Sequence, residues 1–200
     1  QAELEGSAWL ERQGLAALPR LWQLIRVEPG WETAVEAALG EALAALPTRL
    51  TPDWIAQPPE ARFELALPPL TDEPAPFALQ PSDARLRPLA DLIHTEDEVV
   101  AHFLGDRLAL AYAADNLADA LARRAELPVG GMIATREGHR IGRASVVFNA
   151  PEKGHHGLLE RVREIAGLEE ALALAGERMQ EVEEELRLAE EALMAGRRQA

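Results

Sequence analysis

One pattern of apolar and polar positions occurs twice along the chain. Residues 24–43 read LIRVEPGWETAVEAALGEAL, and residues 92–108 read LIHTEDEVVAHFLGDRL. Each copy opens with Leu-Ile, carries an acidic residue three positions after the Ile (Glu28 and Glu96), continues with helical apolar spacing and ends in Leu-Gly-acidic-spacer-Leu. The second copy is three residues shorter between Ile and Gly. The repetition predicts an internally duplicated scaffold. Such scaffolds bind through surfaces at least as often as they catalyse.

The first half of the chain is predicted to contain helices and strands in alternation. A short helix over residues 2–13 ends at Gly14, and residues 21–27 form a strand. A Pro-Gly pair follows that strand, and a helix over residues 31–46 then carries its apolar residues on one face. Residues 62–67 alternate as a strand does.

The second half is predicted to follow a similar order. It contains a helix over residues 96–104, a strand over 107–113, a helix ending at 125, and a hairpin of residues 132–135 and 139–148. Asp115 or Asn116 is expected to cap the second helix, and Glu137-Gly138 to form the turn of the hairpin. Six prolines within residues 68–88 predict a loop or linker between the halves. Residues 149–157 are expected to be a polar connector.

The C-terminal segment has a different period. Its apolar residues recur at spacings of three and four, which is typical of a coiled-coil seam: Ile165, Leu168, Leu172, Ala175, Met179, Val182, Leu186, Ala189 and Leu193. The position opposite the seam is Glu in every heptad. The predicted N-terminal helix is too short to cover this seam. We therefore expect most of it to associate with another chain or to fray.

The motifs of the two halves stand in a recognisable order. In the first half an aliphatic strand precedes EPGW and a helix with the letters AVEAALG. In the second half DLI, FLG and a strand precede the hairpin around residues 133–141. This order resembles the hinge domain of bacterial SMC (structural maintenance of chromosomes) proteins over about residues 14–148.

The resemblance implies an α+β fold, namely a two-lobed hinge with mixed sheets and helices and a long C-terminal coiled-coil helix. It divides the chain into a coiled-coil stub (residues 1–13), lobe one with the Pro-rich linker (14–88), lobe two (89–150), and a connector with the coiled-coil arm (151–200). It further implies a ring-like homodimer formed through sheet edges, an antiparallel arm helix from the same chain, and ATPase heads that lie outside this chain.

The chain departs from the family where a Gly-rich stretch follows the hairpin near the dimer contact. Only Gly142 is retained there, so the close backbone approach of the family cannot be transferred. We predict that the interface is formed by the residues of this segment and by an opposing strand: Gly142, Arg143, Ala144, Ser145 and Val146, with Phe63, Leu65 and Leu67.

Charge leaves two interpretations of one segment open. The formal net charge is -14, and a uniformly acidic surface would repel nucleic acid. Residues 136–163, however, hold six basic against three acidic residues, a local excess of three. The basic side chains either contact DNA or solvate the hairpin and the start of the arm: Arg136, Arg140, Arg143, Lys153, Arg161 and Arg163.

Other chemistry has little support in the residues. The chain has no Cys, no P-loop and no nucleophile-elbow motif, so we expect no enzyme in this chain and no cofactor. His155-His156 could ligate a metal, but a doublet in a connector is more often solvated, so we expect no metal site. No apolar run long enough to span a membrane and no signal-peptide pattern occurs, so we expect a cytoplasmic protein. The resemblance to SMC proteins implies that it is associated with the nucleoid.

The resemblance to SMC hinge domains implies that the function is homodimerisation. The chain would join two coiled-coil arms so that an ATP-driven complex can entrap DNA in chromosome condensation and segregation, with DNA itself a possible partner and no small-molecule substrate. The alternative is a duplicated protein–protein interaction or adaptor module, unrelated to DNA, whose coiled coil specifies the partner.

Overall fold

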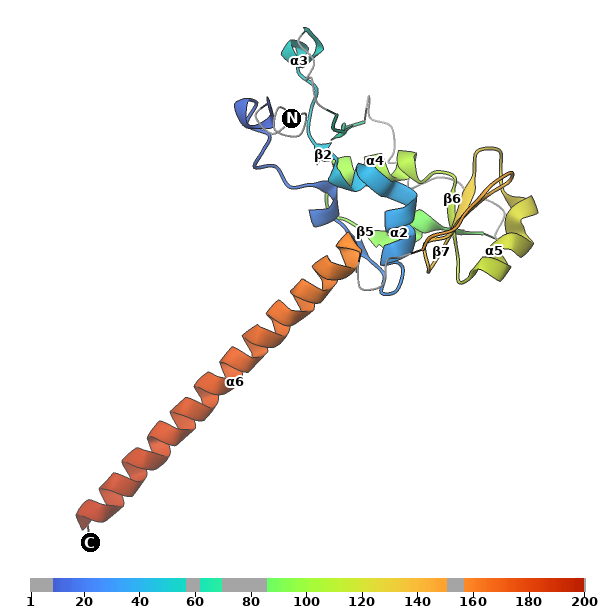
Figure 1. Cartoon of the computed structure of the whole chain (residues 1–200). Coiled ribbons are helices and arrows are strands. Elements are labelled where there is room, and N and C mark those ends of the chain that lie inside the picture. The colour runs from blue at the N-terminus through green and yellow to red at the C-terminus, as the bar shows by residue number, and fades with distance from the viewer. Residues whose placement is uncertain (1–8, 57–61, 70–85, 151–156, 200) are drawn as a thin grey trace. The chain divides into compact units, whose positions relative to one another are not determined.

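The computed structural model describes residues 9–56, 62–69, 86–150 and 157–199 (Figure 1), and the side chains of 55–56 and 189–199 lie outside this description. Within the described residues, 9–12 are helical, as the predicted N-terminal helix requires. The chain divides into two compact units, Gln1–Leu159 and Glu160–Ala200.

The two copies of the repeat meet in short strands that begin at or just after their Leu-Ile pairs. Strand β1 (Arg26–Val27) pairs antiparallel with β5 (Ile93–His94), with Val27 opposite Ile93. A 3-10 helix precedes each strand, η1 (Leu21–Gln23) and η4 (Leu89–Leu92). The duplication seen in the sequence is therefore also a structural pairing.

The predicted strand over residues 21–27 is wrong for residues 21–25. The Arg20 N–H donates to Gln23 Oε1 at 2.7 Å, and the Leu24 N–H donates to Leu21 O at 3.0 Å. These local hydrogen bonds close a tight turn, so only the last two residues are extended.

The Leu-Gly pairs of the two copies have different structures. Helix α2 (Glu32–Leu39) ends at Gly40, whose φ of 54° leaves the helical region. The helix predicted over residues 31–46 is thus too long, and a 3-10 helix η2 (Gly40–Ala44) replaces its second part. Gly105, by contrast, lies inside helix α4 (Glu98–Arg107).

Helix α4 begins and ends later than predicted. Asp97 caps it, because Asp97 Oδ1 accepts from the N–H groups of Val99 and Val100 at 2.9 and 3.0 Å. The helix takes in Arg107, so the strand predicted over 107–113 begins only at β6 (Ala111–Ala114).

A five-stranded sheet contains most of the second half. Its order is β4-β6-β7-β8-β9, and only the β6–β7 pair is parallel. The other strands of this sheet are β4 (Arg87–Pro88), β7 (Met132–Thr135), β8 (Arg140–Gly142) and β9 (Val146–Val147).

The connections of this sheet agree with the predicted helix and hairpin. Between the parallel strands run α5 (Leu117–Arg123) and η5 (Arg124–Glu126). Asn116, rather than Asp115, caps α5, and its Oδ1 accepts from the Asp119 N–H at 2.9 Å. The predicted hairpin is confirmed, with Gly138 at φ 84° in its turn, although its second arm is divided between β8 and β9.

The sheet buries apolar residues on both faces, because successive residues of a strand point in opposite directions. In β7, Ala134 belongs to the largest hydrophobic cluster, and Ile133 to a second one. Helix α2 contacts β7 in the largest cluster, and α5 supplies Ala120 to the second.

The largest cluster draws on both copies of the repeat. It contains Leu21 and Val35 of the first half together with Leu92 and Leu104 of the second, all fully buried. The predicted boundary between residues 88 and 89 therefore passes through a shared core. Whether the halves act as separate lobes stays a prediction.

A third cluster lies around a two-stranded parallel sheet of β2 (Leu46–Pro47) and β3 (Leu65–Ala66). Strand β3 is shorter than the predicted strand over residues 62–67. Trp9 packs there, its ring 5.1 Å from that of Phe63 and 5.6 Å from that of Trp54 in α3 (Pro52–Ala56).

The C-terminal segment is one uninterrupted helix, α6 (Leu158–Gln199), as the heptads predict. Its first two residues fall in the first compact unit and the rest in the second. Within the described residues, no helix is long and apolar enough to span a membrane.

Candidate functional site: the open sheet edges

Two of these sheets have four outer strands, and proline occupies two of them. The N–H groups of Leu46 and Thr48 donate to β3, so the nitrogen of Pro47 lies on the other side of β2, where it has no hydrogen to donate. Strand β4, the outer strand of the larger sheet, contains Pro88. Proline restricts the addition of a further strand, which leaves β3 and β9 as the open edges of these two sheets.

The open edge of β3 has a defined set of backbone groups. Glu64 O and Ala66 O accept from β2, each at 3.0 Å. Because consecutive residues of a strand present their hydrogen-bonding groups to opposite sides, the groups of Leu65 and Leu67 face away from β2. In the described part of the chain neither residue makes a backbone hydrogen bond.

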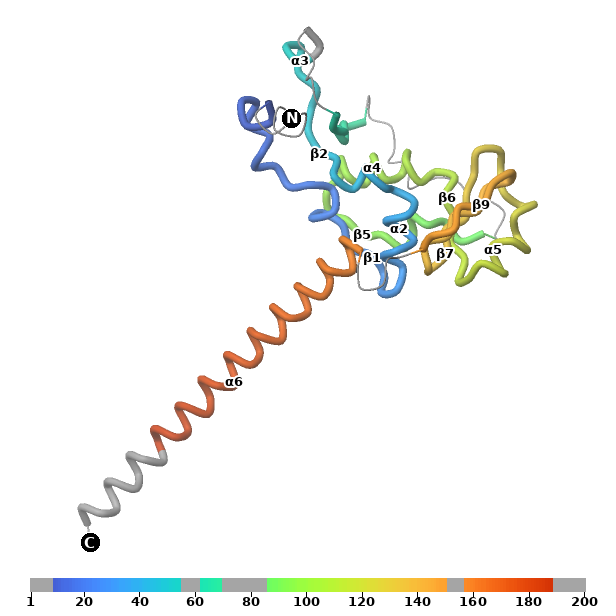
Figure 2. Tube along the Cα trace, in the orientation of Figure 1, coloured from blue at the N-terminus to red at the C-terminus, as the bar shows by residue number. Residues whose placement is uncertain are grey.

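Strand β9 has the same alternation. Its register pairs Ile141 with Val146, and the Gly142 N–H donates to Ser145 O at 2.8 Å. This hydrogen bond places the backbone groups of Val146 and then Phe148 on the outer side. Strand β9, labelled in Figure 2, is the last strand of the sheet.

The residues predicted for the interface lie at the end of β8, in the turn after it, in β9, and in or beside β3. Gly142 ends β8, Arg143 and Ala144 form the turn, and Ser145 closes it. Only Val146 of that segment has its backbone on the open edge. On the opposing side, Phe63 and Leu65 both pack against the third cluster, and the backbone groups of Leu65 and Leu67 face the open edge. Their role as an interface stays a prediction.

Two exposed apolar residues beside the edge were not predicted as site residues. Val147 is 45% exposed and Phe148 69% exposed, and Leu67 on the other edge is 40% exposed. The rings of Phe148 and His139 meet in an edge arrangement, with their centres 5.9 Å apart. The run Val146-Val147-Phe148 is β-branched and aromatic, a composition typical of a strand, and it lies within the predicted hairpin arm over residues 139–148.

Arg136, one of the predicted DNA contacts, is held by other residues. Its Nε lies 2.8 Å from Asp115 Oδ1, and its guanidinium carbon lies 4.2 Å from the centre of the Trp31 ring. Its Nη1 also donates to Gly30 O at 3.5 Å. The side chain therefore joins the hairpin to the start of α2.

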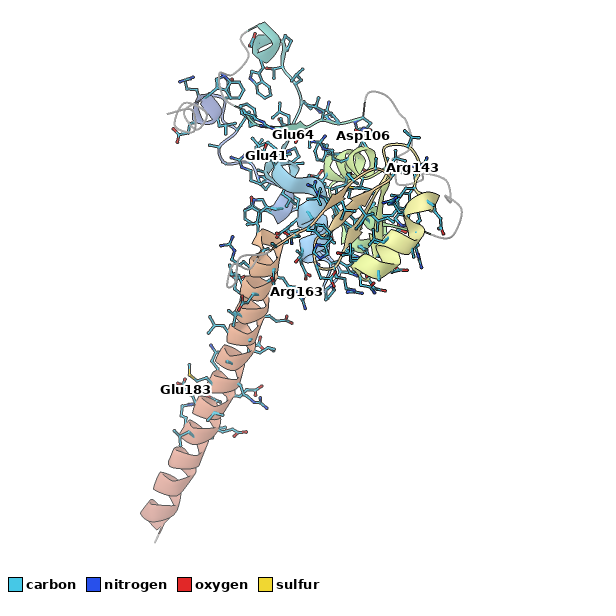
Figure 3. The ribbon with its side chains drawn as sticks, turned by 45° about the vertical axis from the view of Figure 1, so that its right-hand side comes forward. Glu41, Glu64, Asp106, Arg143, Arg163 and Glu183 are labelled. Atoms are coloured by element: carbon cyan, nitrogen blue, oxygen red, sulfur yellow. The ribbon has the colours of Figure 1, made fainter. Side chains whose placement is uncertain are left out.

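The other basic residues are distributed between the units. Arg140 is half-buried on β8, and Arg143 is exposed in the turn (Figure 3). Arg161 and Arg163 belong to the second unit, and Lys153 lies outside the described residues. A DNA contact by this set stays a prediction.

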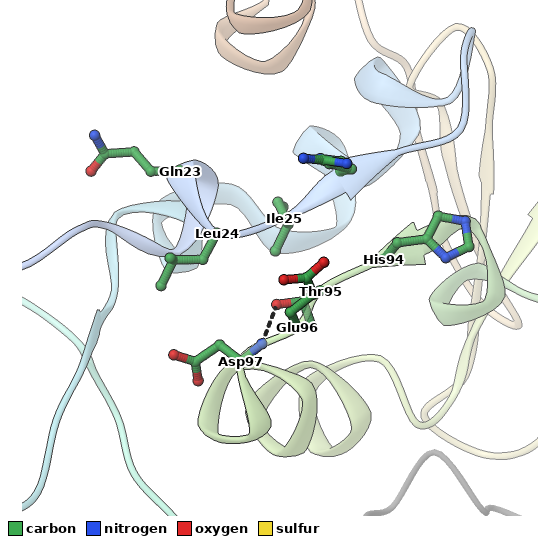
Figure 4. A pocket seen from close by; sticks show the side chains of 8 residues that line it. Gln23, Leu24, Ile25, His94, Thr95, Glu96 and Asp97 are labelled. Carbon is green, nitrogen blue, oxygen red and sulfur yellow. Dashed lines mark hydrogen bonds between the residues drawn. The ribbon is translucent and has the colours of Figure 1, made fainter.

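A surface hollow lies where the two repeat copies pair (Figure 4). Its volume is about 480 Å³, and it is lined by residues 23–26 and 94–97. The Asp97 N–H donates to Thr95 Oγ1 at 3.2 Å in its wall. A second hollow of about 540 Å³ beside β3 is lined by charges of both signs, including Glu41 and Glu64 (Figure 3).

The part of the chain that the structure describes contains no cluster of side chains suited to bind a metal ion. Among those residues, no group of three or more His, Asp or Glu side chains could hold an ion. The doublet His155-His156 lies outside them.

The seam of α6 is exposed along its described length. The apolar side chains at the seam are between 56% and 75% exposed: Ile165, Leu168, Leu172, Met179, Val182 and Leu186. Leu193 belongs to the same helix, but its side chain lies outside the description. An exposed apolar stripe of this length needs a partner helix.

Comparison with known proteins identifies relatives of the whole arrangement. The profile described as "SMC proteins Flexible Hinge Domain" matches residues 15–124. The chromosome partition protein Smc of Burkholderia pseudomallei is 40% identical over 166 residues, which cover 80% of this chain and 14% of that protein. The protein of the same name from Bordetella petrii is 41% identical over 165 residues, with the same two coverages. The chain thus corresponds to about one seventh of these curated relatives.

Solved structures show the same fold at lower identity. An asymmetric dimer of the Geobacillus stearothermophilus SMC hinge domain matches with a TM-score of 0.59 and 19% identity, covering 91% of this chain and 86% of that chain. The Pyrococcus furiosus Smc hinge domain with an extended coiled coil matches with a TM-score of 0.50 and 16% identity, covering 86% and 64%. The predicted family and fold are therefore confirmed, and the chain belongs to the SMC proteins as a hinge domain with a long C-terminal coiled-coil helix.

Proposed function

We propose that this chain is the homodimerisation hinge of a chromosome partition protein, and that it joins two coiled-coil arms so that an ATP-driven complex can enclose DNA. The observation that carries the proposal is the pair of open edges, β3 and β9, in a molecule whose other outer strands in the same sheets contain proline. The family assignment favours this function over an unrelated adaptor module.

The two edges are complementary in their backbone groups. Leu65 and Leu67 on one edge, and Val146 and Phe148 on the other, are each two residues apart, a spacing of roughly 6.6 Å in a strand. Pairing β3 of one copy with β9 of a second copy makes the same contact twice under a two-fold axis, which closes a ring.

Apolar burial must contribute more than the hydrogen bonds to such a contact. Each edge is short, and a hydrogen bond contributes about 0.5–1.5 kcal/mol net. Full burial of a Leu, Val or Phe side chain stabilises by about 1.5–3 kcal/mol. We therefore expect Phe148, the most exposed apolar side chain at these edges, to contribute most to the dimer.

The first prediction concerns Phe148. Phe148→Asp places a charge where apolar surface is to be buried and should raise the dimer dissociation constant at least about tenfold, the loss that corresponds to one apolar anchor. Sedimentation equilibrium of the full chain measures this constant. The matched control is Leu121→Asp on the exposed side of α5, because Leu121 is also exposed and lies on a helix rather than at a sheet edge. Equal dissociation constants for the two variants would contradict the edge interface.

The arms complete the proposed function. The exposed seam of α6 would pair with an antiparallel arm helix from the same protein, and the chain would act with the nucleoid in the cytoplasm. ATPase heads are expected in the rest of the protein, of which this chain represents only a small part.

Direct DNA contact would use the basic residues that are least engaged within the fold. Arg140 and Arg143 are better candidates than Arg136, whose guanidinium has three partners. Contacts to phosphate give binding that does not depend on sequence and weakens with salt. Reversing the charge of Arg140 and Arg143 together should lower DNA retention in a gel-shift titration, and unchanged retention would refute the contact.

A further inference from the structure

The first turn of α6 is held by a side chain from a helix more than one hundred residues earlier in the chain. The Leu159 N–H donates to Glu36 Oε1, across a separation of 123 residues. Leu159 is itself 5% exposed and belongs to the largest hydrophobic cluster. Both residues lie within the first compact unit, so the contact belongs to the body of the molecule.

Glu36 performs the role of a helix cap. The first N–H groups of a helix have no carbonyl acceptor within the helix, and a Ser, Thr, Asp or Asn side chain just before the helix usually accepts from one of them. Gly157 precedes α6 and has no side chain for this purpose. The carboxylate also lies at the helix end where the dipole favours negative charge.

The space beside Gly157 is occupied by the same carboxylate. A Cβ atom added to Gly157 would overlap both carboxylate oxygens of Glu36, far inside van der Waals contact. A conventional cap residue therefore cannot replace Gly157 without displacing Glu36. The missing side chain of Gly157 therefore leaves the space that the Glu36 carboxylate occupies.

Helix α2 also contacts the hairpin that leads to β9. Thr33 Cγ2 lies 2.9 Å from the position that a Cβ of Gly138 would take, and Trp31 at the start of α2 packs under the guanidinium of Arg136. Thr33 and Glu36 are three residues apart, so they lie on neighbouring positions of one helix face. One short helix therefore touches both the hairpin and the first turn of α6.

We propose that Glu36 is a positioning residue that fixes the start of the arm helix on the body of the hinge. Its carboxylate takes the place of the missing cap residue of α6. Helix α2, which contains Glu36, also contacts the hairpin that precedes strand β9. The effect is a property of a single chain. Loss of the anchor would therefore leave dimerisation through β3 and β9 intact, and a failure of either idea leaves the other standing.

Four substitutions separate the parts of this contact. Glu36→Ala removes both acceptor and charge, Glu36→Asp keeps the charge but is one methylene shorter, and Glu36→Gln keeps an acceptor at the same reach. Gly157→Ala keeps the Glu36 residue, but its Cβ would displace the Glu36 carboxylate. Glu137→Ala, at an exposed position in the hairpin turn, is the matched control.

Hydrogen exchange gives the first measurement. The Leu159 N–H has no acceptor within α6, so its protection depends on Glu36. Glu36→Ala and Gly157→Ala should accelerate exchange at Leu159 by roughly 2- to 30-fold, the range that corresponds to loss of a helix cap. Glu36→Gln should retain most of the protection, Glu36→Asp should lose it, and Glu137→Ala should leave it unchanged.

The second measurement separates positioning from stability. The chain has no Cys, so spin labels at Glu126→Cys on the body and Glu177→Cys on α6 report one distance when labelled chain is diluted with unlabelled chain. Glu36→Ala, Glu36→Asp and Gly157→Ala should broaden the distance distribution, whereas Glu36→Gln and Glu137→Ala should keep its width. Wild-type exchange and width in both Glu36→Ala and Gly157→Ala would overturn the proposal.

Discussion

Arg136 connects parts of the molecule that lie far apart in the sequence. It comes from the turn of the hairpin, yet its guanidinium stacks on Trp31 and bonds Gly30 O, 106 residues away. It also pairs with Asp115 after β6. A residue that reads as free positive charge in the sequence therefore connects the hairpin to the first copy of the repeat.

Removal of the Arg136 side chain should destabilise the fold. An exposed ion pair contributes up to about 1 kcal/mol and a cation–π contact about 0.5–1 kcal/mol, so Arg136→Ala should lower the free energy of unfolding by about 1–2 kcal/mol. Urea denaturation measures the change. Arg143→Ala, in an exposed turn, is the control and should stay within about 0.5 kcal/mol of wild type. Equal stability of the two variants would show that the Arg136 contacts contribute nothing measurable.

The Leu-Gly pairs of the two repeat copies show that similar sequences can form different structures. Leu-Gly ends α2 at Gly40, whose φ of 54° is accessible chiefly to glycine, but the corresponding Gly105 continues α4. The second copy is three residues shorter between Ile and Gly, and its helix, capped at Asp97, continues past the glycine to Arg107. Helix ends therefore depend on the partners of each copy as well as on the shared motif.

The helix α6 carries a charge pattern that bears on its partner. Between residues 164 and 193, the positions beside its seam hold five acidic residues and one basic residue: Glu164, Glu169, Glu183, Glu185, Glu190 and Arg178. In a parallel pair of two α6 helices, Glu164 would face the second copy's Glu169, and like charges beside a seam are unfavourable. The pattern therefore favours a partner helix with basic flanking residues over a second α6.

A peptide of residues 158–200 tests this at the level of the element. We expect it to stay monomeric at micromolar concentration in low salt, and to bind a designed helix that carries Lys opposite these Glu residues. The complex should weaken as salt screens the charges. A designed helix of equal hydrophobicity with Glu at those positions is the control. Self-association as strong as the designed pair, measured by sedimentation, would contradict the charge argument.

The proposed dimer contact and the coiled-coil seam belong to different compact units of the molecule. Strands β3 and β9 both belong to the first compact unit, whereas the exposed seam belongs to the second. Self-association through the edges therefore does not require the coiled coil. Leu159 must be retained in any shortened chain, because it is buried in the main core.

Deletion of residues 165–200 should leave the dimer intact. The shortened chain should remain a dimer in sedimentation velocity with a dissociation constant within about tenfold of the full chain, since the edges and the first turns of α6 are intact. Combining the deletion with Phe148→Asp should yield a monomer. A deletion variant that is already monomeric would instead assign dimerisation to the arm.

Local patterns were sufficient for much of the fold. The heptads determined α6, the Asn-capped helix and the Gly138 turn follow from side chains adjacent in the chain, and the ordered motifs of both halves identified the family. The strand boundaries were less accurate, since β3 and β9 are two residues long and are defined by pairing rather than by composition. Of the residues predicted for the interface, Leu65, Leu67 and Val146 lie on the edges that the structure leaves open, and the interface itself stays a prediction.

The sequence by itself therefore determined what periodicity and neighbouring residues encode: the duplication, the coiled-coil arm and the order of the elements. Tertiary structure alone decided that Pro47 faces the outer side of β2, that Arg136 is bound at α2, and that Glu36 caps α6. The two contacts made by Arg136 and Glu36 join residues separated by 106 and 123 positions, where no local pattern specifies which backbone groups meet. They form because the buried apolar faces of both copies share one core, and that packing brings the polar groups together.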